Sequence, residues 1–452
     1  MKNILMIAYY YPPKGGAGVQ RTAKFAKYLC SFGYNVHVLT VKEKTRGVID
    51  YSLESDIQEG ITVHRTFIDE SSFIDKLITF MNKGASHQSA NSNLHETVKK
   101  YNKIKPYIRK LMKKVFLSIY NIIYIPDAQK GWIDYAVEEG KKIIRKNNID
   151  IIYTTSSPYT SHLIGLKLSK DLNVKWIADF RDPWASNPFV DYNFIIQAIN
   201  NNLESKVVKR ADRIVSVSKP IIDDFIMRYP NEKEKKFVVI PNGYDEEDFK
   251  NLDLSLSNDN KKFKILYSGT LYGKRSPEKI LSVIDKLIES NLINKDKIEI
   301  KFIGEIGSEF KNILNGFSNK FPDILKYTDY MPHSESLIEL ANANALLLII
   351  DEGRGSEGIY TGKIFEYIRT GKPIIAIVPE GVARDLVLDT KTGYTAYPSK
   401  FSEIENIVYM SYSDFLGGNK NFNPGWDKII EYSRENISKQ LDNIICDVLR
   451  NS

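Results

Sequence analysis

The chain has 452 residues, a net charge of +7, 42% apolar residues and 26% charged residues. This length exceeds what one ordinary hydrophobic core holds, so we expect two domains, and the composition excludes a disordered or fibrous chain. No stretch reaches the roughly 20 apolar residues that span a bilayer, and we expect no signal peptide. The two cysteines, Cys30 and Cys446, are too far apart in sequence to predict a disulfide framework or a cysteine metal site, which fits a reducing cytoplasm.

The first half of the chain predicts strands that alternate with helices. Short apolar runs end at turn-forming residues, and each is followed by a longer segment with helical spacing. We expect strands at 3–9, 34–40, 61–66, 150–155, 175–179, 213–218 and 236–240. We expect helices at 19–32, 128–147, 159–171 and 193–209. This alternation is typical of a parallel sheet wrapped by helices.

A polar stretch, "NLDLSLSNDNKK" at 251–262, predicts a linker, after which the same alternation starts again. The second set of strands is expected at 263–268, 298–303, 345–350 and 373–377. The second set of helices is expected at 277–290, 309–321, 334–342 and 361–370. The sequence therefore predicts the α/β class with two facing Rossmann-like domains and a cleft between them. The expected ranges are 1–250 with an insertion at 69–125, 263–424, and a helix at 425–452 that packs back toward the first domain.

The first strand runs into a glycine-rich junction, "YYYPPKGGAGVQR". Gly15 and Gly16 place bare backbone at a helix N-terminus, where amides and the helix dipole favour a phosphate. A dinucleotide site is a less favoured alternative, because Arg21 stands where the third glycine of that motif belongs and no acidic residue follows the second strand. The remaining alternative is a purely structural tight turn.

A second glycine-containing junction, "SEGIYTGKIFEYIRTGKPIIAI", covers 356–377. Lys363 and Glu366 are three residues apart and share one face of the predicted helix. A cation and an acceptor at this point suit a diphosphate and a ribose. The alternative is a simple ion pair within the helix.

Two further polar stretches follow predicted strands of the first domain, where open α/β sheets bind ligands. "SSPYTSHLIG" contains His162, which could bind a sugar or an acceptor, and "DFRDPW" contains Asp182, which could position or deprotonate an acceptor hydroxyl. The alternative for His162 is a buried core histidine. The alternatives for Asp182 are an ion pair with Arg181 and a hydrogen-bond acceptor in the turn before Pro183. The acidic run 245–248 predicts the cap of a helix, and no acid pair predicts a metal site.

Taken in order, these stretches resemble glycosyltransferase family 4, the sugar-nucleotide-dependent enzymes of GT-B architecture. The resemblance also includes "IVSVSKPI", "VIPNGYDEEDF" and "ILYSGTLYGKRSPE". It implies that Gly15 and Gly16 line the cleft near the donor diphosphate and the acceptor. Glu366 matches the second glutamate of the family's E-x7-E motif, which implies a contact with the nucleotide ribose.

The first glutamate of that motif falls on Gly358, which is a departure from the family pattern. Glu357, one residue earlier, is the candidate to reach the sugar hydroxyls if the backbone adjusts. Gly358 and Ile359 belong to the same donor-binding loop by this resemblance.

The family's diphosphate-binding cations are also incomplete. Arg275 stands where the family usually has a lysine, and Lys274 beside it is the substitute if the loop shifts by one residue. Thr270 stands where many members have an arginine, and Lys363 is the candidate that supplies the missing charge. Cations and amides of this kind stabilise a departing diphosphate without a metal.

The positive charge is concentrated between residues 97 and 125, which hold eight Lys and Arg and no Asp or Glu. Apolar residues in this segment recur every three or four positions, so it predicts a basic amphipathic helix. Such a helix suits an anionic membrane surface and is not assigned to nucleic acid. The alternative is an apolar stripe packed on the first domain.

Together these features predict a hexosyltransferase-type enzyme that needs no cofactor besides its nucleotide-diphosphate sugar substrate. We expect it to be retaining and metal-independent. The resemblance implies a glycan or lipid-linked acceptor in bacterial surface polysaccharide or glycolipid synthesis, with the protein at the inner face of the membrane. The alternatives are a sugar-nucleotide epimerase of the same architecture and a degenerate member that binds a nucleotide sugar without catalysis.

Overall fold

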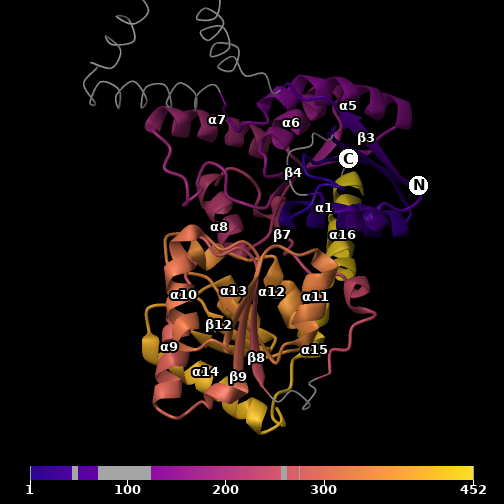
Figure 1. Cartoon of the computed structure of the whole chain (residues 1–452). Helices are drawn as coiled ribbons and strands as arrows, with labels where there is room; N and C mark the ends of the chain where they lie inside the picture. Colours follow the sequence, from indigo (N-terminus) through magenta and orange to yellow (C-terminus); the bar gives the residue numbers. More distant parts are fainter. Residues whose placement is uncertain (1, 43–48, 70–123, 256–261, 274, 451–452) are drawn as a thin grey trace, which may run out of the picture.

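The computed structural model describes residues 2–42, 49–69, 124–255, 262–273 and 275–450. Two lobes, each a parallel sheet wrapped by helices, are stacked one on the other (Figure 1). The sheet of the first lobe has the strand order β3-β2-β1-β4-β5-β6-β7. Its strands are β1 (Lys2–Ile7), β2 (Tyr34–Val41), β3 (Ile61–Thr66), β4 (Ile151–Ser156), β5 (Lys175–Phe180), β6 (Arg213–Ser216) and β7 (Phe237–Val239). Its helices are α1 (Ala17–Ser31), α5 (Ile133–Asn147), α6 (Thr160–Leu172), α7 (Phe194–Arg210) and α8 (Lys219–Arg228).

The sheet of the second lobe has the strand order β10-β9-β8-β11-β12-β13. Its strands are β8 (Phe263–Ser268), β9 (Ile298–Ile303), β10 (Leu325–Thr328), β11 (Ala345–Ile349), β12 (Ile374–Ile377) and β13 (Gly393–Ala396). Its helices are α9 (Glu278–Glu289), α10 (Lys311–Lys320), α11 (His333–Asn342), α12 (Lys363–Thr370), α13 (Val382–Asp389), α14 (Phe401–Leu416) and α15 (Trp426–Ile429). The predicted α/β class with two doubly wound sheets is confirmed.

Both faces of the first sheet are buried, which explains why its central strands are apolar runs instead of alternating patterns. Along β1, Leu5 packs in a core built with α5 and α6, whereas its neighbours Ile4 and Met6 pack in a core built with α1. Adjacent residues of a strand point to opposite faces, so each sheet face has its own core.

The chain passes between the lobes twice, and the two crossings are bonded to each other. At the first crossing the amide of Tyr244 donates to the carbonyl of Tyr432 (3.1 Å), and at the second the amide of Arg434 donates to the carbonyl of Tyr244 (2.7 Å). A side chain at Gly243 would collide with the carbonyl of Tyr432, so glycine allows this close approach. The last helix, α16 (Arg434–Arg450), then returns to the first lobe, where Figure 1 shows it in yellow beside α1.

Helix α16 packs with one apolar face on the core between α1 and the first sheet, through Ile437, Leu441, Ile445 and Val448. Asp442 of the same helix accepts a hydrogen bond from the hydroxyl of Tyr34 in β2 (2.5 Å). The C-terminal helix therefore belongs to the core of the first lobe.

Two predictions fall on residues that the structure leaves undescribed. Nearly all of the insertion at 69–125, with the basic segment 97–125 inside it, lies outside the described residues, as does the middle of the linker at 251–262. Within the described part of the chain, no helix combines the length and the apolar character that crossing a bilayer requires.

Candidate functional site

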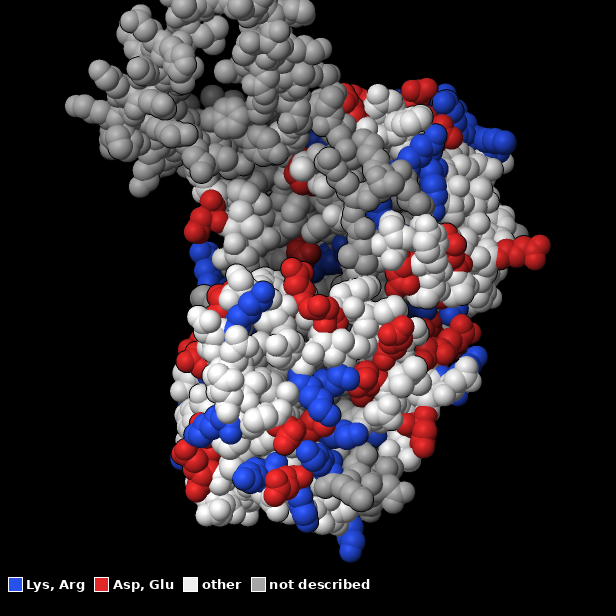
Figure 2. All heavy atoms as spheres, viewed as in Figure 1, with Lys and Arg blue, Asp and Glu red and all other residues white. Residues whose placement is uncertain are grey.

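Loops at the carboxyl ends of both sheets contact each other between the lobes. The Ser218 hydroxyl, at the start of α8, donates to the carbonyl of Gly358 in the second lobe (3.0 Å). A side chain at Gly355, whose φ is +80°, would collide with Pro188 of the first lobe. Figure 2 shows a recess between the lobes in which both acidic and basic side chains lie. Ligands of open α/β sheets bind at these strand ends.

The glycine-rich junction forms the loop between β1 and α1. Gly16 precedes the helix with φ +98°, a conformation that favours glycine, yet a side chain there would meet no atom within 4 Å. Glycine is therefore favoured at Gly16 by the turn, and the space in front of Gly16 is open; Gly15, the residue before it, is half-buried. Arg181 anchors this loop from the end of β5 by donating to the carbonyl of Gly18 (2.6 Å).

A buried ion pair lies behind the junction. Arg21 donates to Asp179 twice, from Nε (2.9 Å) and from Nη2 (2.8 Å), and both side chains are buried. The hydroxyls of Tyr153 (2.6 Å) and Thr155 (3.0 Å) also donate to this carboxylate. Burial opposes the charge of Asp179, but the charge of Arg21 and these hydrogen bonds hold its pKa below the usual value. All of this charge is compensated inside the first lobe.

His162, a predicted catalytic residue, is fully buried in the first lobe. Its Nδ1 lies 2.8 Å from the hydroxyl of Thr154, and its ring packs on Phe180 with centroids 4.3 Å apart. Burial lowers the pKa of His162 to about 3, so the ring is neutral. Nε2 has no hydrogen-bond partner among the described residues, but the ring does not reach the surface of the cleft.

Asp182 lies at the surface, at the end of β5, and accepts a hydrogen bond from the hydroxyl of Ser157 (3.2 Å). The neighbouring Arg181 donates to backbone carbonyls, among them that of Ser157 (3.0 Å). The carboxylate of Asp182 is therefore exposed at the rim of the cleft and keeps capacity to accept another hydrogen bond.

Lys363, in the first turn of α12, is the most unusual cation of the second lobe. Its ammonium lies 3.9 Å from the ring centroid of Tyr267 and directly against Gly269, where a side chain would collide with it. Burial and the nearby charge of Arg275 lower the pKa of Lys363 to about 7. Because Gly269 has no side chain, the Lys363 ammonium can lie against the backbone at the end of β8.

Arg275 lies in the loop that follows β8, with its guanidinium 5.3 Å from the ring centroid of Tyr272. Thr270 is exposed in the same loop, and its carbonyl accepts a hydrogen bond from Tyr267 (3.2 Å). Lys274 lies outside the described residues. Among the residues that the structure describes, no acidic side chain forms an ion pair with Lys363 or Arg275.

Glu366 lies one turn along α12 from Lys363 and meets His333 at the start of α11. The His333 Nε2 lies 2.8 Å from Oε1 of Glu366, and the carboxylate is one-quarter exposed. Burial opposes charge on His333, but the hydrogen bond and charge of Glu366 and the charge of Asp248 raise its pKa to about 9. The structure therefore brings Arg275, Lys363 and Glu366 together at one set of strand ends.

The loop at the departure from E-x7-E contacts the first lobe. Glu357 is exposed, and its backbone packs so closely on Gly381 that a side chain at Gly381 would collide with it. A Cβ at Gly358 would lie 3.5 Å from Pro220, so its missing side chain would face α8. Ile359 is half-buried against the core of the second lobe. Gly358 therefore lies in the interface between the lobes, against the start of α8.

Sequence reasoning missed two residues next to this site. His333 opens α11, far from Glu366 in the chain, and no motif signals their contact. Thr361, two residues before α12, has a buried hydroxyl with no partner among the described residues. The position of Thr361 just before a helix N-terminus is the sequence feature that could have indicated it. The acidic run was predicted correctly as a cap, because Asp245 accepts from the amide of Glu247 at the start of a short 3-10 helix (Glu246–Phe249).

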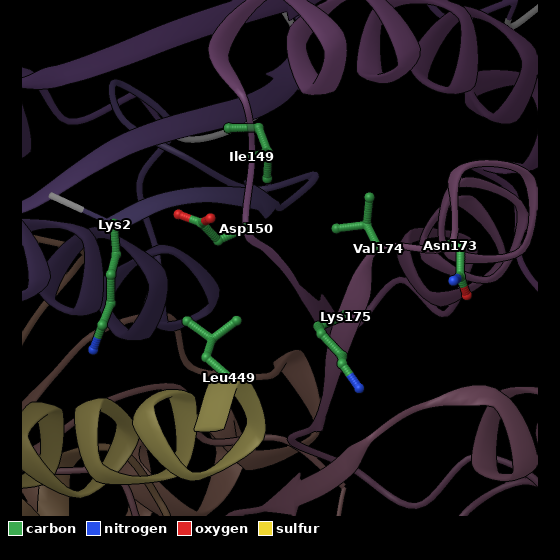
Figure 3. A pocket seen from close by; sticks show the side chains of 7 residues that line it. All are labelled: Lys2, Ile149, Asp150, Asn173, Val174, Lys175 and Leu449. Carbon is green, nitrogen blue, oxygen red and sulfur yellow. The ribbon is translucent and has the colours of Figure 1, made fainter. Parts of the chain in front are cut away.

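An open hollow of the described chain lies away from these strand ends. Figure 3 shows it, with a volume of about 500 Å³, lined by side chains that include Lys2, Asp150, Lys175 and Leu449. These residues lie at the amino ends of β1, β4 and β5, opposite the edge where α/β sheets bind ligands. We therefore do not assign the site to this hollow.

Solved structures share the whole architecture. The sucrose-phosphate synthase from Thermosynechococcus elongatus matches with a TM-score of 0.63 and 14% identity over 100% of both chains. A glycosyltransferase from Rickettsia africae matches with a TM-score of 0.63 and 16% identity over 100% of this chain and 99% of its own. Anabaena HepE in complex with UDP-glucose matches with a TM-score of 0.61 and 13% identity over 99% of this chain and 100% of its own.

The two facing lobes therefore define the GT-B class of fold. Residues 106–248 match the family model described as Glycosyltransferase Family 4. No match was found among curated protein sequences.

Proposed function

We propose that the chain transfers a sugar from a nucleotide-diphosphate sugar to an acceptor hydroxyl, with the donor held by the second lobe. Lys363, Arg275 and the amides after Gly269 bind the diphosphate, and Glu366 binds the ribose. Anabaena HepE was solved with UDP-glucose, so uridine diphosphate (UDP) is the first nucleotide to test.

The observation that carries this proposal is that Lys363 and Arg275 lie near each other and that neither forms an ion pair with an acid among the described residues, although the charge of Glu366 also acts on Lys363. Lys363 is half-buried, and burial and the charge of Arg275 lower its pKa to about 7 against the opposing charge of Glu366, so holding its proton costs free energy. A diphosphate recovers that free energy, and more of it as the leaving group gains charge in the transition state. Perturbed lysines in clefts are typical of functional sites.

The sugar of the donor would lie between the loop 356–359 and the open space in front of Gly16. Asp182, exposed at the rim, is the side chain that we assign to positioning the acceptor hydroxyl, while the buried His162 shapes the strand end beneath it. Because Gly358 replaces a motif glutamate, Glu357 is the acidic side chain of this loop that is left to contact the sugar. By family resemblance, the transfer retains the anomeric configuration and needs no metal.

The first experiment incubates the protein with nucleotide sugars and a bacterial lipid extract. Transfer predicts that free nucleotide is released only when an acceptor is present. Conversion of one nucleotide sugar into another without acceptor would instead identify an epimerase. Binding of nucleotide sugar with neither reaction would identify a non-catalytic member.

Replacement of Glu366 by alanine tests the ribose contact. We expect Glu366→Ala to weaken UDP binding by about 1–3 kcal/mol, the range for a lost hydrogen bond to a charged group. Calorimetric titration measures the change. Glu335→Ala, an exposed acid in the first turn of α11, is the matched control and should bind UDP normally. Equal affinities of the Glu366 variant and wild type would exclude the ribose role.

We also propose that the acceptor is a lipid-linked glycan of a bacterial surface polymer or glycolipid, reached from the cytoplasmic face of the membrane. The support is the basic segment 97–125, because each basic residue near an anionic bilayer contributes about 1 kcal/mol.

Neutralising this segment tests the proposed docking. We expect glutamine at all eight basic positions to reduce sedimentation with anionic liposomes, most strongly at low salt. The positions are Lys99, Lys100, Lys103, Lys105, Arg109, Lys110, Lys113 and Lys114. Neutral liposomes serve as the control, and unchanged sedimentation with anionic liposomes would rule out this surface.

A further inference from the structure

We propose that His333 is a positioning residue that fixes the carboxylate of Glu366 so that its free oxygen meets the ribose hydroxyls of the nucleotide. This inference rests on the proposed function of the donor site. It adds a residue from α11, a helix that carries none of the predicted site residues.

The contact itself is direct. Nε2 of His333 lies 2.8 Å from Oε1 of Glu366, whereas Oε2 has no hydrogen-bond partner in the described part of the chain. An N–H that donates to one carboxylate oxygen restricts rotation of the group and leaves the other oxygen oriented as an acceptor. Such a geometry is pre-organised for a hydroxyl that arrives from the cleft.

The surroundings keep His333 charged. Glu366 faces it from α12, and Asp248 faces it from the 3-10 helix that follows the first lobe. Lys24 of α1 contributes opposing positive charge to His333, but its ammonium also lies 3.6 Å from Asp248 and holds that carboxylate in place. Arg434 of α16 has a buried guanidinium near the same two acids. Burial lowers the pKa of Arg434, and the charges of Glu366 and Asp248 oppose this shift. Two acids flank the imidazole, so the protonated ring is favoured and donates to Glu366.

These charged groups come from both lobes: Lys24 pairs with Asp248, Asp248 acts on His333 through its charge, and His333 bonds to Glu366. Lys24 belongs to α1, the helix that begins at the glycine-rich junction, and Glu366 belongs to α12 on the donor side. His333 and Asp248 stand between them. Asp248 therefore links the orientation of the Glu366 carboxylate, the proposed acceptor for the ribose hydroxyls, to the first lobe.

The test compares UDP with its 2′,3′-dideoxy form, which lacks the ribose hydroxyls. We define discrimination as the ratio of the two dissociation constants, in which the diphosphate contribution cancels. We expect His333→Ala and Glu366→Ala each to reduce discrimination by about tenfold, and the double variant to lose no more than either single variant. The affinity for dideoxy-UDP should stay close to that of wild type.

Two further variants separate positioning from folding. His333→Gln keeps an N–H donor and should recover most of the discrimination, whereas Glu335→Ala on the same helix should change nothing. Urea unfolding of each variant establishes that the binding data come from folded protein.

A pH series gives a second readout. In wild type, discrimination should fall as the pH rises through about 9, where His333 loses its proton, and it should stay flat in His333→Gln. Lys363 titrates in the same series but contributes equally to both ligands.

The outcomes distinguish this inference from the proposed function. Loss of discrimination in Glu366→Ala but not in His333→Ala would overturn the role of His333 alone. Unchanged discrimination in Glu366→Ala, or failure of UDP, ADP and GDP alike to bind, would overturn the proposed donor site. A His333→Ala variant that weakens dideoxy-UDP equally would show a merely structural role and would also overturn the inference.

Discussion

The strand ends of the two lobes carry the same kinds of residues but use them differently. In the first lobe, Arg21 and Asp179 are buried and bind each other, and further hydroxyls complete the hydrogen bonding. In the second lobe, Lys363 and Arg275 stand near each other without an acidic partner among the described residues. The first set of charges is paired within the fold, whereas neither cation of the second set forms an ion pair among the described residues.

This difference shows that position alone does not identify a binding site. Both sets lie where α/β sheets bind ligands. The distinguishing feature is the lowered pKa of Lys363, because burial and the like charge of Arg275 outweigh the opposing charge of Glu366. Arg21 differs, because it already donates to Asp179 and to the carbonyl of Ile240.

The sharpest test of the comparison replaces one arginine from each lobe. We expect Arg21→Met to lower the free energy of unfolding by about 3–5 kcal/mol, because it leaves Asp179 buried without a countercharge. Arg275→Met should change stability by less than about 0.5 kcal/mol and should instead weaken UDP binding. Urea unfolding and calorimetric titration measure the two effects. Equal stability losses would contradict the distinction.

A second test uses the buried neutral His162. The unfolded chain protonates this residue below about pH 6.5, whereas the folded chain keeps it neutral down to about 3, so stability is lost as the pH falls. Between pH 6.5 and 4.5 this loss amounts to about 2 kcal/mol. Urea unfolding should show a smaller loss over this interval in His162→Asn. An identical pH dependence in both proteins would contradict the burial of the ring.

The smallest expected effect concerns Lys363. Its pKa is about 7 in the free protein, and a bound diphosphate raises it, so binding takes up a proton above pH 7. The dissociation constant for UDP should rise by at most about tenfold from pH 7 to pH 8. Lys363→Arg should abolish this slope because arginine stays charged. Calorimetry in buffers of different ionisation enthalpy measures the proton uptake, and its absence in wild type would contradict the assignment.

The sequence predicted the central strands of both sheets because their residues are apolar on both faces. Two strands were missed, β10 with the sequence LKYT and β13 with GYTA. Both lie at sheet edges, and three of the four residues of β10 are exposed, so no apolar run marks it. Helix α8 was also missed, although Pro220 in its first turn is a recognised helix-start signal.

The site could be predicted only where its residues are close in the chain. Lys363 and Glu366 share a helix face, and their spacing is visible in the sequence; their roles remain predictions. The contact of His333 with Glu366 depends on how α11 packs beside α12, which no local pattern encodes. His162 is buried between Thr154 and Phe180. A sequence pattern cannot distinguish such a buried histidine from one that faces an open site.

The paired crossings at Tyr244 and Tyr432 determine how the lobes can move. These two backbone segments are hydrogen-bonded to each other, so the two connections between the lobes lie side by side and not at separate places. Sliding one lobe across the other would break this pairing, whereas swinging them apart would preserve it. Rotation of the lobes about these paired segments would therefore change the separation between the glycine-rich junction of the first lobe and Lys363 of the second without breaking either backbone hydrogen bond.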